Sequence, residues 1–515
     1  MKTLVLVEGK IDFSVLKLEI LKNSIIISFD INSHKSLSEK KITHNFVEDY
    51  FNEKDKKEID DLALYLGINW HKHKTIEKNL KYNELNLGTL LELEMPSYFF
   101  NHLKRVIGIK KILEKENPKK IISYSLNNYI KHISKNSDID LVLLKNNMSS
   151  NLFFDKIEIP LNLGFINIKI KLSRKKYSIL KNTMDKMFNS IGKTKFNKKE
   201  LQNNQSILLV NFDTKLYEDF LKSFSNSDKN IIILNQRRPS ISNFETLQII
   251  KNSNCKILCL KDFESKITKN KNKLEQIKLN KKLKEILNQE NLLNTIFSHN
   301  QESFWNIIKD EFSQIISSRF SERIEKLILI DEMFNEMNIK SVLDWAHTGM
   351  EEKEITFFAN KKGISIFCLQ HGIMTLNPKF EKYHPIMPVL PSNNSKMLVW
   401  GKSMKNYLLD HKIDSKQITI VGSPRHDRFF RKKIVSNNNT ILIASNLFFH
   451  VNFDGNDTRA YERFELYLKE ILEYIKKNSN KKPIIKLHQT EYFQISSIIK
   501  KIDSTIPIYQ YEDIL

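Results

Sequence analysis

The chain has 515 residues, of which 41% are hydrophobic and 28% are charged. This balance excludes an intrinsically disordered protein, and the length exceeds what one hydrophobic core supports, so we expect two to four domains. The net charge of +22 favours polyanionic partners such as nucleic acid, an anionic membrane face or phosphorylated substrates, although a coding bias toward Lys, Asn and Ile produces the same excess.

Cysteine usage indicates a reducing compartment. Three cysteines are too few to form a disulfide framework in so large a chain. On a strand, Cys255 and Cys259 would lie on one face. We interpret them as buried structural residues, because no CxxC motif or histidine pair accompanies them. The third cysteine, Cys368, lies in an apolar run discussed below.

The start of the chain does not resemble a targeting segment. Its short apolar run is interrupted by Glu8 and Lys10, so residues 3–9 are predicted to form a first strand rather than a signal peptide. No apolar run approaches the roughly 18 residues that a membrane-spanning helix requires, so no such helix is predicted.

The first 200 residues mix strand-like and helical patterns. Residues 53–66 and 98–116 carry apolar side chains at helical spacing. Further buried strands, bounded by polar or turn residues, are predicted at residues 24–30, 119–125 and 139–145. A polar segment rich in Lys and Asn, residues 192–206, indicates a linker.

A second α/β unit is predicted after this linker. Its expected strands are residues 206–213, 230–239, 255–263, 340–349 and 364–372. Helices are expected at 266–288, where the lysines form a solvated face, at 291–338, and at 351–361. This alternation of strands and helices predicts a parallel sheet with right-handed crossovers.

A loop at residues 375–394 with four prolines is predicted to mark an interdomain crossing. The unit after it has expected helices at 403–411 and 461–477. Its expected strands are residues 397–401, 418–424, 440–445, 483–489 and 506–510. With only about 120 residues this unit is at the small end for a domain, and we expect it to be unfinished at Leu515.

Three strand ends carry residues suited to phosphate chemistry. His371, held between Gln370 and Gly372, follows an apolar run. Ligands of open α/β sheets bind at the carboxyl ends of strands, where an imidazole can accept a proton from a hydroxyl or hydrogen-bond a phosphate. A capping or packed histidine is the alternative interpretation.

The second candidate is the sequence GSPRHD, residues 422–427. Gly422 allows close approach, Ser423 is kept from a helical conformation by the following proline, and Arg425 could bind a phosphate bidentately. Asp427 could cap a following helix or orient Arg425; a purely structural Arg–Asp junction is the alternative.

The third candidate pairs Lys486 with His488, two residues apart at the end of an expected strand. Both would point the same way and could meet a diphosphate. A surface lysine beside a packed histidine explains the pair equally well.

Taken in order, QHG, a WG strand end, GSPRxD and a K-L-H strand end span Lys340 to His488. This segment, about 30% of the chain, resembles GT-B-type surface-polysaccharide transferases, in particular the superfamily of CDP-glycerol glycerophosphotransferases, capsule-polysaccharide transferases and polysialyltransferases. In that family a histidine before glycine, matching His371, is taken as the catalytic base. A histidine of an HP motif, matching His488, binds the nucleotide phosphate, and the loop arginine, matching Arg425, lines the same cleft. Here a glutamine replaces the proline of that HP motif, and the family's acidic dipeptide and Ser/Thr-rich donor loop would lie beyond the end of this sequence.

A rival motif lies at the start of the chain. VLVEGKID resembles the first motif of Toprim nucleic-acid enzymes, in which a glutamate after a strand helps to bind magnesium. The second motif would require a DxD strand end, and the nearest candidate, Asp30-Ile31-Asn32, comes too early and lacks the second aspartate. We therefore interpret Glu8 as an ordinary strand-end carboxylate.

We expect an α/β protein that begins with an N-terminal α/β module (residues 1–200), to which the resemblance does not extend. The resemblance implies a Rossmann-like acceptor-side domain (201–392) and a Rossmann-like donor-side domain (393–515) that faces it across a cleft and is truncated. It implies transfer of a glycosyl or polyol-phosphate group from a CDP-, CMP- or UDP-activated donor to a surface polysaccharide or glycolipid.

In this hypothesis His371 is the base. Arg425, His488, Lys486 and Ser423 bind the donor phosphates, while Gln370, Gly372, Gly422 and Asp427 support them.

No bound cofactor, metal ion or nucleic acid is expected. We expect a cytoplasmic protein that could lie peripherally on the anionic inner face of the cell membrane. A UDP-GlcNAc 2-epimerase-like enzyme, with more carboxylates around the cleft, and a non-catalytic glycan- or nucleotide-binding relative stay open.

Overall fold

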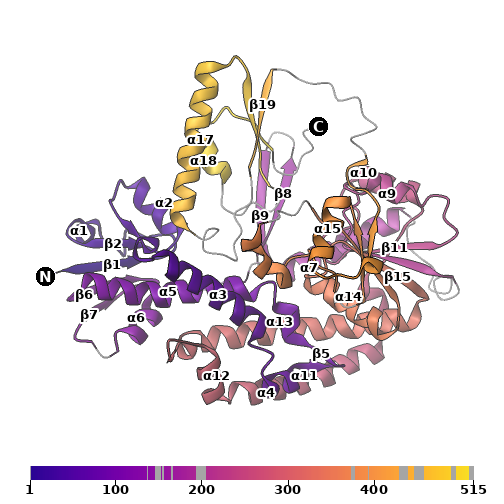
Figure 1. The fold of residues 1–515 in the computed structure, drawn as a ribbon, viewed down its shortest axis with the longest axis horizontal. Helices are drawn as coiled ribbons and strands as arrows, with labels where there is room; N and C mark the ends of the chain where they lie inside the picture. Colours follow the sequence, from indigo (N-terminus) through magenta and orange to yellow (C-terminus); the bar gives the residue numbers. More distant parts are fainter. Residues whose placement is uncertain are drawn as a thin grey trace.

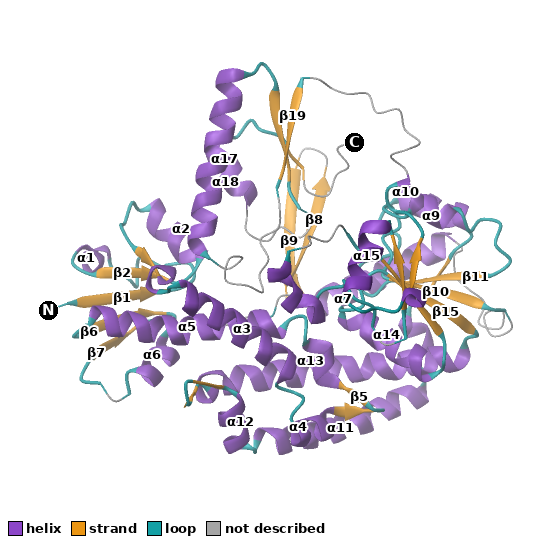
Figure 2. Cartoon of the chain, viewed as in Figure 1, coloured by secondary structure: helices purple, strands orange, loops and turns teal. Residues whose placement is uncertain are grey.

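The fold is α/β, as predicted, with three parallel sheets linked by helices (Figures 1 and 2). The structure is a computed structural model. It describes residues 2–135, 137–144, 152, 156–163, 166–192, 204–372, 377–392, 394–427, 439–445, 457–488 and 495–509.

The N-terminal module contains a five-stranded parallel sheet in the order β3-β2-β1-β6-β7. Its four longer strands coincide with the four predicted from apolar runs. The strands are β1 (Thr3–Val7), β2 (Ile25–Ser28), β3 (Asn45–Phe46), β6 (Lys120–Tyr124) and β7 (Asp140–Leu143). The larger helices around it are α2 (Ile31–Glu39), α3 (Glu53–Asn69), α5 (Met95–Glu116) and α6 (Asn127–Ile133). The chain leaves β1 in one direction and returns to β6 on its other side, which creates a switch point between these two strands.

The largest sheet has seven parallel strands in the order β12-β11-β10-β15-β16-β17-β18. They are β10 (Ser206–Val210), β11 (Asn230–Leu234), β12 (Lys256–Ile257), β15 (Ile339–Asp344), β16 (Ser365–Leu369), β17 (Lys396–Val399) and β18 (Ile418–Ile420). Its larger helices are α10 (Phe244–Ser253), α11 (Lys266–Leu287), α13 (Trp305–Glu336), α14 (Met350–Lys361) and α15 (Lys402–Asp410). The switch point of this sheet lies between β10 and β15.

Three local predictions differ from the structure. The long helical pattern at 291–338 is divided into α12 (Glu290–Ile296) and α13 by a small hairpin, in which Asn300 and Gln301 have φ values of 49° and 67°. Left-handed residues stop a helix, whatever the apolar spacing around them. The strand predicted at 255–263 keeps two residues in β12 and continues as the 3₁₀ helix η3 (Leu260–Phe263).

The proline-rich loop is the third difference, and the prediction of an interdomain crossing there is wrong. It forms the 3₁₀ helix η4 (Pro378–Ile386) and joins β16 to β17, which are hydrogen-bonded neighbours in one sheet. Met397 and Val399 of β17 pack against Cys368 of β16 in a shared apolar cluster. The strands β17 and β18 thus complete the seven-stranded sheet, although they follow the boundary predicted at residue 393.

The C-terminal part contains a three-stranded parallel sheet, β19-β20-β21, formed by β19 (Thr440–Ala444), β20 (Lys482–Lys486) and β21 (Ile508–Tyr509). Helices α17 (Thr458–Asn478) and α18 (Ile495–Ile502) accompany it. Between the first two sheets the chain forms an antiparallel hairpin, β8 (Lys156–Leu163) and β9 (Ile166–Ser173), followed by α7 (Arg174–Gly192). The hairpin and α7 were not predicted. Most of the predicted linker lies outside the described residues.

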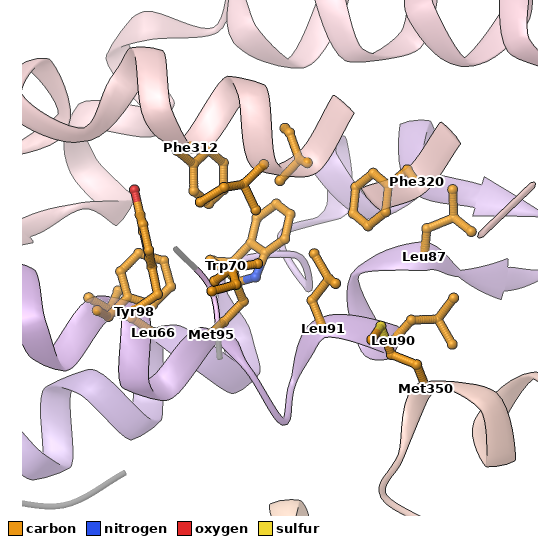
Figure 3. Close-up of a cluster of buried hydrophobic side chains, with 14 of the residues drawn as sticks. Leu66, Trp70, Leu87, Leu90, Leu91, Met95, Tyr98, Phe312, Phe320 and Met350 are labelled. Carbon is orange, nitrogen blue, oxygen red and sulfur yellow. The ribbon is translucent and has the colours of Figure 1, made fainter. Parts of the chain in front are cut away.

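The N-terminal module and the seven-stranded sheet share one hydrophobic core. Side chains from α3 and α5 interleave with those of α13 and α14, and the Trp70 and Phe312 ring centroids are 4.9 Å apart (Figure 3). The same cluster reaches Leu4 on β1 and Leu208 on β10. Burial of this extent fixes the two parts relative to each other.

Helix α17 connects the C-terminal sheet to the N-terminal module, beside which it stands in Figure 1. The buried Glu48 carboxylate accepts hydrogen bonds from the Thr458 backbone N–H (3.1 Å) and hydroxyl (3.2 Å) at the start of this helix. An anion at a helix N-terminus is favourable because the free N–H groups carry partial positive charge. Glu48 also pairs with Lys104, and Asp49 pairs with Arg459.

Candidate functional site

The candidate site lies at the carboxyl ends of the strands of the seven-stranded sheet, near its switch point. His371 directly follows β16 and Gln370, and its ring stacks on Trp345, which follows β15 (centroids 4.5 Å apart, planes 25° apart). The Trp345 indole N–H in turn donates to the backbone oxygen of Asn211, the residue after β10 (2.8 Å). Three neighbouring strand ends therefore fix the position of the imidazole.

Gln370 holds the backbone on both sides of His371. Its side-chain oxygen accepts from the Trp400 backbone N–H at the end of β17, and its nitrogen donates to the Gly372 backbone oxygen, each at 2.8 Å. Gln370 is buried. The amide thus has partners on both of its polar atoms and holds the backbone in place on both sides of His371. The supporting role expected of Gln370 and Gly372 stays a prediction.

Arg425 approaches His371 from the turn after β18. Its Nη1 donates to the backbone oxygen of His371 at 3.3 Å. Gly422, at a φ of 78°, occupies the left-handed region that favours glycine and turns the chain away from β18. QHG and GSPRHD are therefore in contact, but at one edge of a single sheet, and not on two domains that face each other across a cleft as the sequence analysis expected.

Two other predicted site residues, Ser423 and Asp427, lie in this turn. The Ser423 hydroxyl shares a hydrogen bond with Nδ1 of His426 within the turn (2.6 Å). Asp427 is exposed, and no contact among the described residues joins it to Arg425. The residues after Asp427, where the sequence predicts a helix for it to cap, lie outside the described residues.

Lys486 and His488 come from the C-terminal sheet, at and just after the end of β20. His488 is exposed, and Lys486 is partly buried. The pKa of His488 is lowered by partial burial and by the positive charges of Arg425 and Lys486. His488 therefore belongs to the same positive region as Arg425, although it comes from another sheet.

His371 is the residue of this region whose ionisation is most affected by its surroundings. Burial, together with the positive charges of Arg425, Arg237 and His488, lowers the pKa of its imidazole to about 4. The ring is therefore neutral at physiological pH and carries a lone pair. Its Nδ1 atom is buried and has no hydrogen-bond partner among the described residues.

A partly buried network of charges near the ring was missed by the sequence analysis. Arg237, just after β11, pairs with Glu351 (3.2 Å) and with Glu352 at the start of α14. The amide of Asn211 donates to Glu352 (2.7 Å), whose pKa is raised by burial. A Cβ at Gly349 would collide with both Arg237 and Glu352, so glycine is needed for this close approach. The sequence could have indicated these residues by their position, because each one follows an apolar strand or lies at the start of the next helix.

The described part of the chain contains one group of three side chains that could hold a metal ion, formed by Asp344, His347 and Cys368. All three are buried. The two ring nitrogens of His347 already have internal partners, Asp344 Oδ2 at 3.0 Å and the Ser395 hydroxyl at 3.2 Å. The arrangement is thus a hydrogen-bonded cluster beneath the site, and the expectation of no bound metal stays a prediction.

Within the described ranges, none of the helices combines the length and apolar character needed to cross a bilayer.

Comparisons with known proteins give no family assignment. No protein-family model and no curated protein matches the chain. Among solved structures, it is similar to the UDP-GlcNAc 2-epimerase from Neisseria meningitidis bound to UDP-GlcNAc, with 14% identity and a TM-score of 0.33, over 60% of this chain and 72% of that one. A second similarity, to an adenylation, ketoreductase and pseudo-Asub multidomain structure of a keto acid-selecting NRPS module, has 9% identity and a TM-score of 0.19 over 94% of this chain and 43% of that one. The α/β assignment rests on the strand order and parallel pairing of this chain's own sheets.

Proposed function

We propose that the protein is a transferase that moves a glycosyl or polyol-phosphate group from a CDP-, CMP- or UDP-activated donor to a surface polysaccharide or glycolipid. The observation that carries the proposal is a neutral imidazole, His371, held beside the guanidinium of Arg425 at the carboxyl edge of a parallel sheet. The ordered motifs from Lys340 to His488 support the same reaction class.

In this reaction the acceptor hydroxyl oxygen forms a bond to the transferred carbon or phosphorus atom. The bond from that atom to the departing phosphate oxygen of the nucleotide breaks, and His371 takes the hydroxyl proton. Arg425, assisted by His488 and Lys486, stabilises the negative charge that develops on the leaving phosphate. No metal ion is required by this scheme.

The low pKa of His371 makes its basicity depend on whether the donor is bound. In the free protein the positive charges of Arg425, Arg237 and His488 oppose protonation of the ring. The negative charge of the bound donor's phosphate groups offsets these positive charges and raises the pKa, so His371 becomes a stronger base when the donor is in place.

The experiment is a nucleotide-release assay with the wild-type chain, His371→Asn and His371→Ala, using CDP-, CMP- and UDP-activated donors with and without glycan acceptors. Loss of a positioned general base lowers turnover by about 10²- to 10⁴-fold. We expect this loss in both variants with nucleotide affinity retained. Wild-type turnover in both would refute the role of His371.

An epimerase acting on a nucleotide sugar is the second candidate, favoured by one observation: the carboxylates Glu351 and Glu352 lie in the network near the His371 ring. The same assay separates the two, because an epimerase converts the donor to its stereoisomer without an acceptor and releases no transferred product. Nucleotide binding without either reaction would instead indicate a non-catalytic binding protein.

A further inference from the structure

The outer face of helix α11 carries apolar side chains where the fold gives them nothing to pack against. Ile267, Leu274 and Ile277 are 79%, 61% and 68% exposed. At about 100° per residue, these three fall within roughly 80° of one another around the helix axis. The helix is anchored by its opposite side, where Leu279, Leu283 and Ile286 are buried.

The apolar stripe is bordered by positive charge. Helix α11 contains eight lysines and two glutamates, a net charge of +6. Lys266, Lys273, Lys281 and Lys284 are exposed, and none of them forms an ion pair within the described part of the chain. Their charges are therefore available to an external anion.

The neighbouring helix α4 (Lys74–Leu80) extends this basic face. It packs against α11, and Lys282 donates to the backbone oxygen of Lys81 just after α4 (3.1 Å). Lys74 and Lys78 of α4 are exposed. In Figure 1 the two helices form the lower edge of the molecule, on the side away from α17.

From these observations we infer that the outer face of α11, formed by Ile267, Leu274 and Ile277 with their flanking lysines, binds the surface of an anionic lipid bilayer. Aliphatic side chains in the middle of a lysine-rich helix face are the pattern of helices that lie in the membrane interface, and each lysine near an anionic surface adds to the attraction. Lysine is depleted at protein–protein interfaces, and the stripe has no aromatic side chain on which a base could stack. The inference goes beyond the proposed transfer reaction and does not depend on it.

The test is co-sedimentation of the full-length protein with phosphatidylcholine vesicles, with and without phosphatidylglycerol, at low and high salt. We expect binding only to the anionic vesicles, and weaker binding at high salt. The triple variant I267S/L274S/I277S should bind at least tenfold more weakly, since it loses all three insertable side chains. The double variant K273E/K281E should lose roughly fivefold per lysine.

Matched controls come from other faces of the molecule. Phe244→Ser removes a 71% exposed apolar side chain from α10, and K412E/K416E reverses two exposed lysines between α15 and β18. Both should bind vesicles like the wild type. Equal binding by I267S/L274S/I277S and the wild type would overturn the inference, as would equal binding to neutral vesicles. A dimer that I267S/L274S/I277S dissociates without weakening vesicle binding would assign the stripe to a second copy of the chain.

Discussion

The five-stranded and seven-stranded sheets both have a switch point, between β1 and β6 in one and between β10 and β15 in the other. In the five-stranded sheet the residue after β1 is Glu8, and Arg105 of α5 donates to both of its carboxylate oxygens at 2.8–3.0 Å. The pair is buried, and Arg105 donates a further bond to the Tyr129 hydroxyl. This carboxylate is matched by a cation from within the fold.

In the seven-stranded sheet, two polar side chains that follow strands, those of His371 and Arg425, have fewer partners within the described part of the fold. Arg425 donates to one backbone oxygen at 3.3 Å, and Nδ1 of His371 has no partner among the described residues. Side chains that follow strands therefore support structure in one sheet and leave capacity for a ligand in the other. The difference indicates that a strand-end charge marks a binding site only when the fold does not already neutralise it.

The largest effect is expected from a change in the Glu8–Arg105 pair, and it tests whether this pair stabilises the fold. Glu8→Gln leaves Arg105 buried without its counter-charge, which costs about 3–5 kcal/mol in comparable pairs. We expect the free energy of unfolding, measured by urea denaturation, to fall by that amount, while nucleotide affinity of the folded protein is retained. Glu19→Gln, at an exposed position, is the matched control. Unchanged stability in Glu8→Gln would show that the pair is not structural.

The complementary change is Arg425→Gln. Hydrogen bonds to charged groups contribute about 1.5–3 kcal/mol, so affinity for a nucleoside diphosphate should fall by roughly 10- to 150-fold in isothermal titration calorimetry. Stability to urea should stay near that of the wild type. Arg238→Gln, on an exposed arginine that pairs with Asp213, should have little effect. If Arg425→Gln lowers stability but not nucleotide affinity, Arg425 has a structural role like that of the Glu8–Arg105 pair and does not bind the ligand.

The smallest effect concerns the position of the His371 ring. Trp345→Phe keeps an aromatic face for stacking but removes the N–H that donates to Asn211. Loss of one such hydrogen bond costs about 1 kcal/mol, or roughly fivefold in kcat/KM. Trp345→Leu, which also removes the stacking, should lose more. Equal activity in Trp345→Leu and the wild type would exclude a positioning role.

Much of the architecture could be predicted because apolar runs are strong signals. The buried strands β1, β2, β6, β10, β11, β15 and β16 all follow from such runs. The hairpin that divides the helical pattern after Ile296 was missed, because a left-handed pair such as Asn300 and Gln301 hardly alters apolar spacing. The proline loop was misread because prolines show that regular structure stops, and they do not show where the chain goes next.

The sequence could predict which residues follow strands, but it could not predict which of them contact one another. His371 and Arg425 follow apolar runs and could be named from that position. Trp345, Asn211 and Arg237 carry the same signal, but they become partners of the site only through the order of strands in the sheet, which brings β10 and β15 side by side. Long-range strand order is not encoded in local periodicity.

The ionisation of His371 gives the most direct test of the central claim, that this imidazole lies in a positive, phosphate-binding region. Its ring signals can be assigned in NMR spectra by comparison with His371→Asn and followed between pH 5 and pH 8, with and without saturating CDP or UDP. The account predicts a neutral ring throughout this range in the free protein, since the pKa is about 4, and a higher pKa in the complex. His102, buried in α5 with a pKa also lowered by burial, should not respond to nucleotide. An ordinary pKa near 6.5 in the free protein, or no change when nucleotide is bound, would contradict the account.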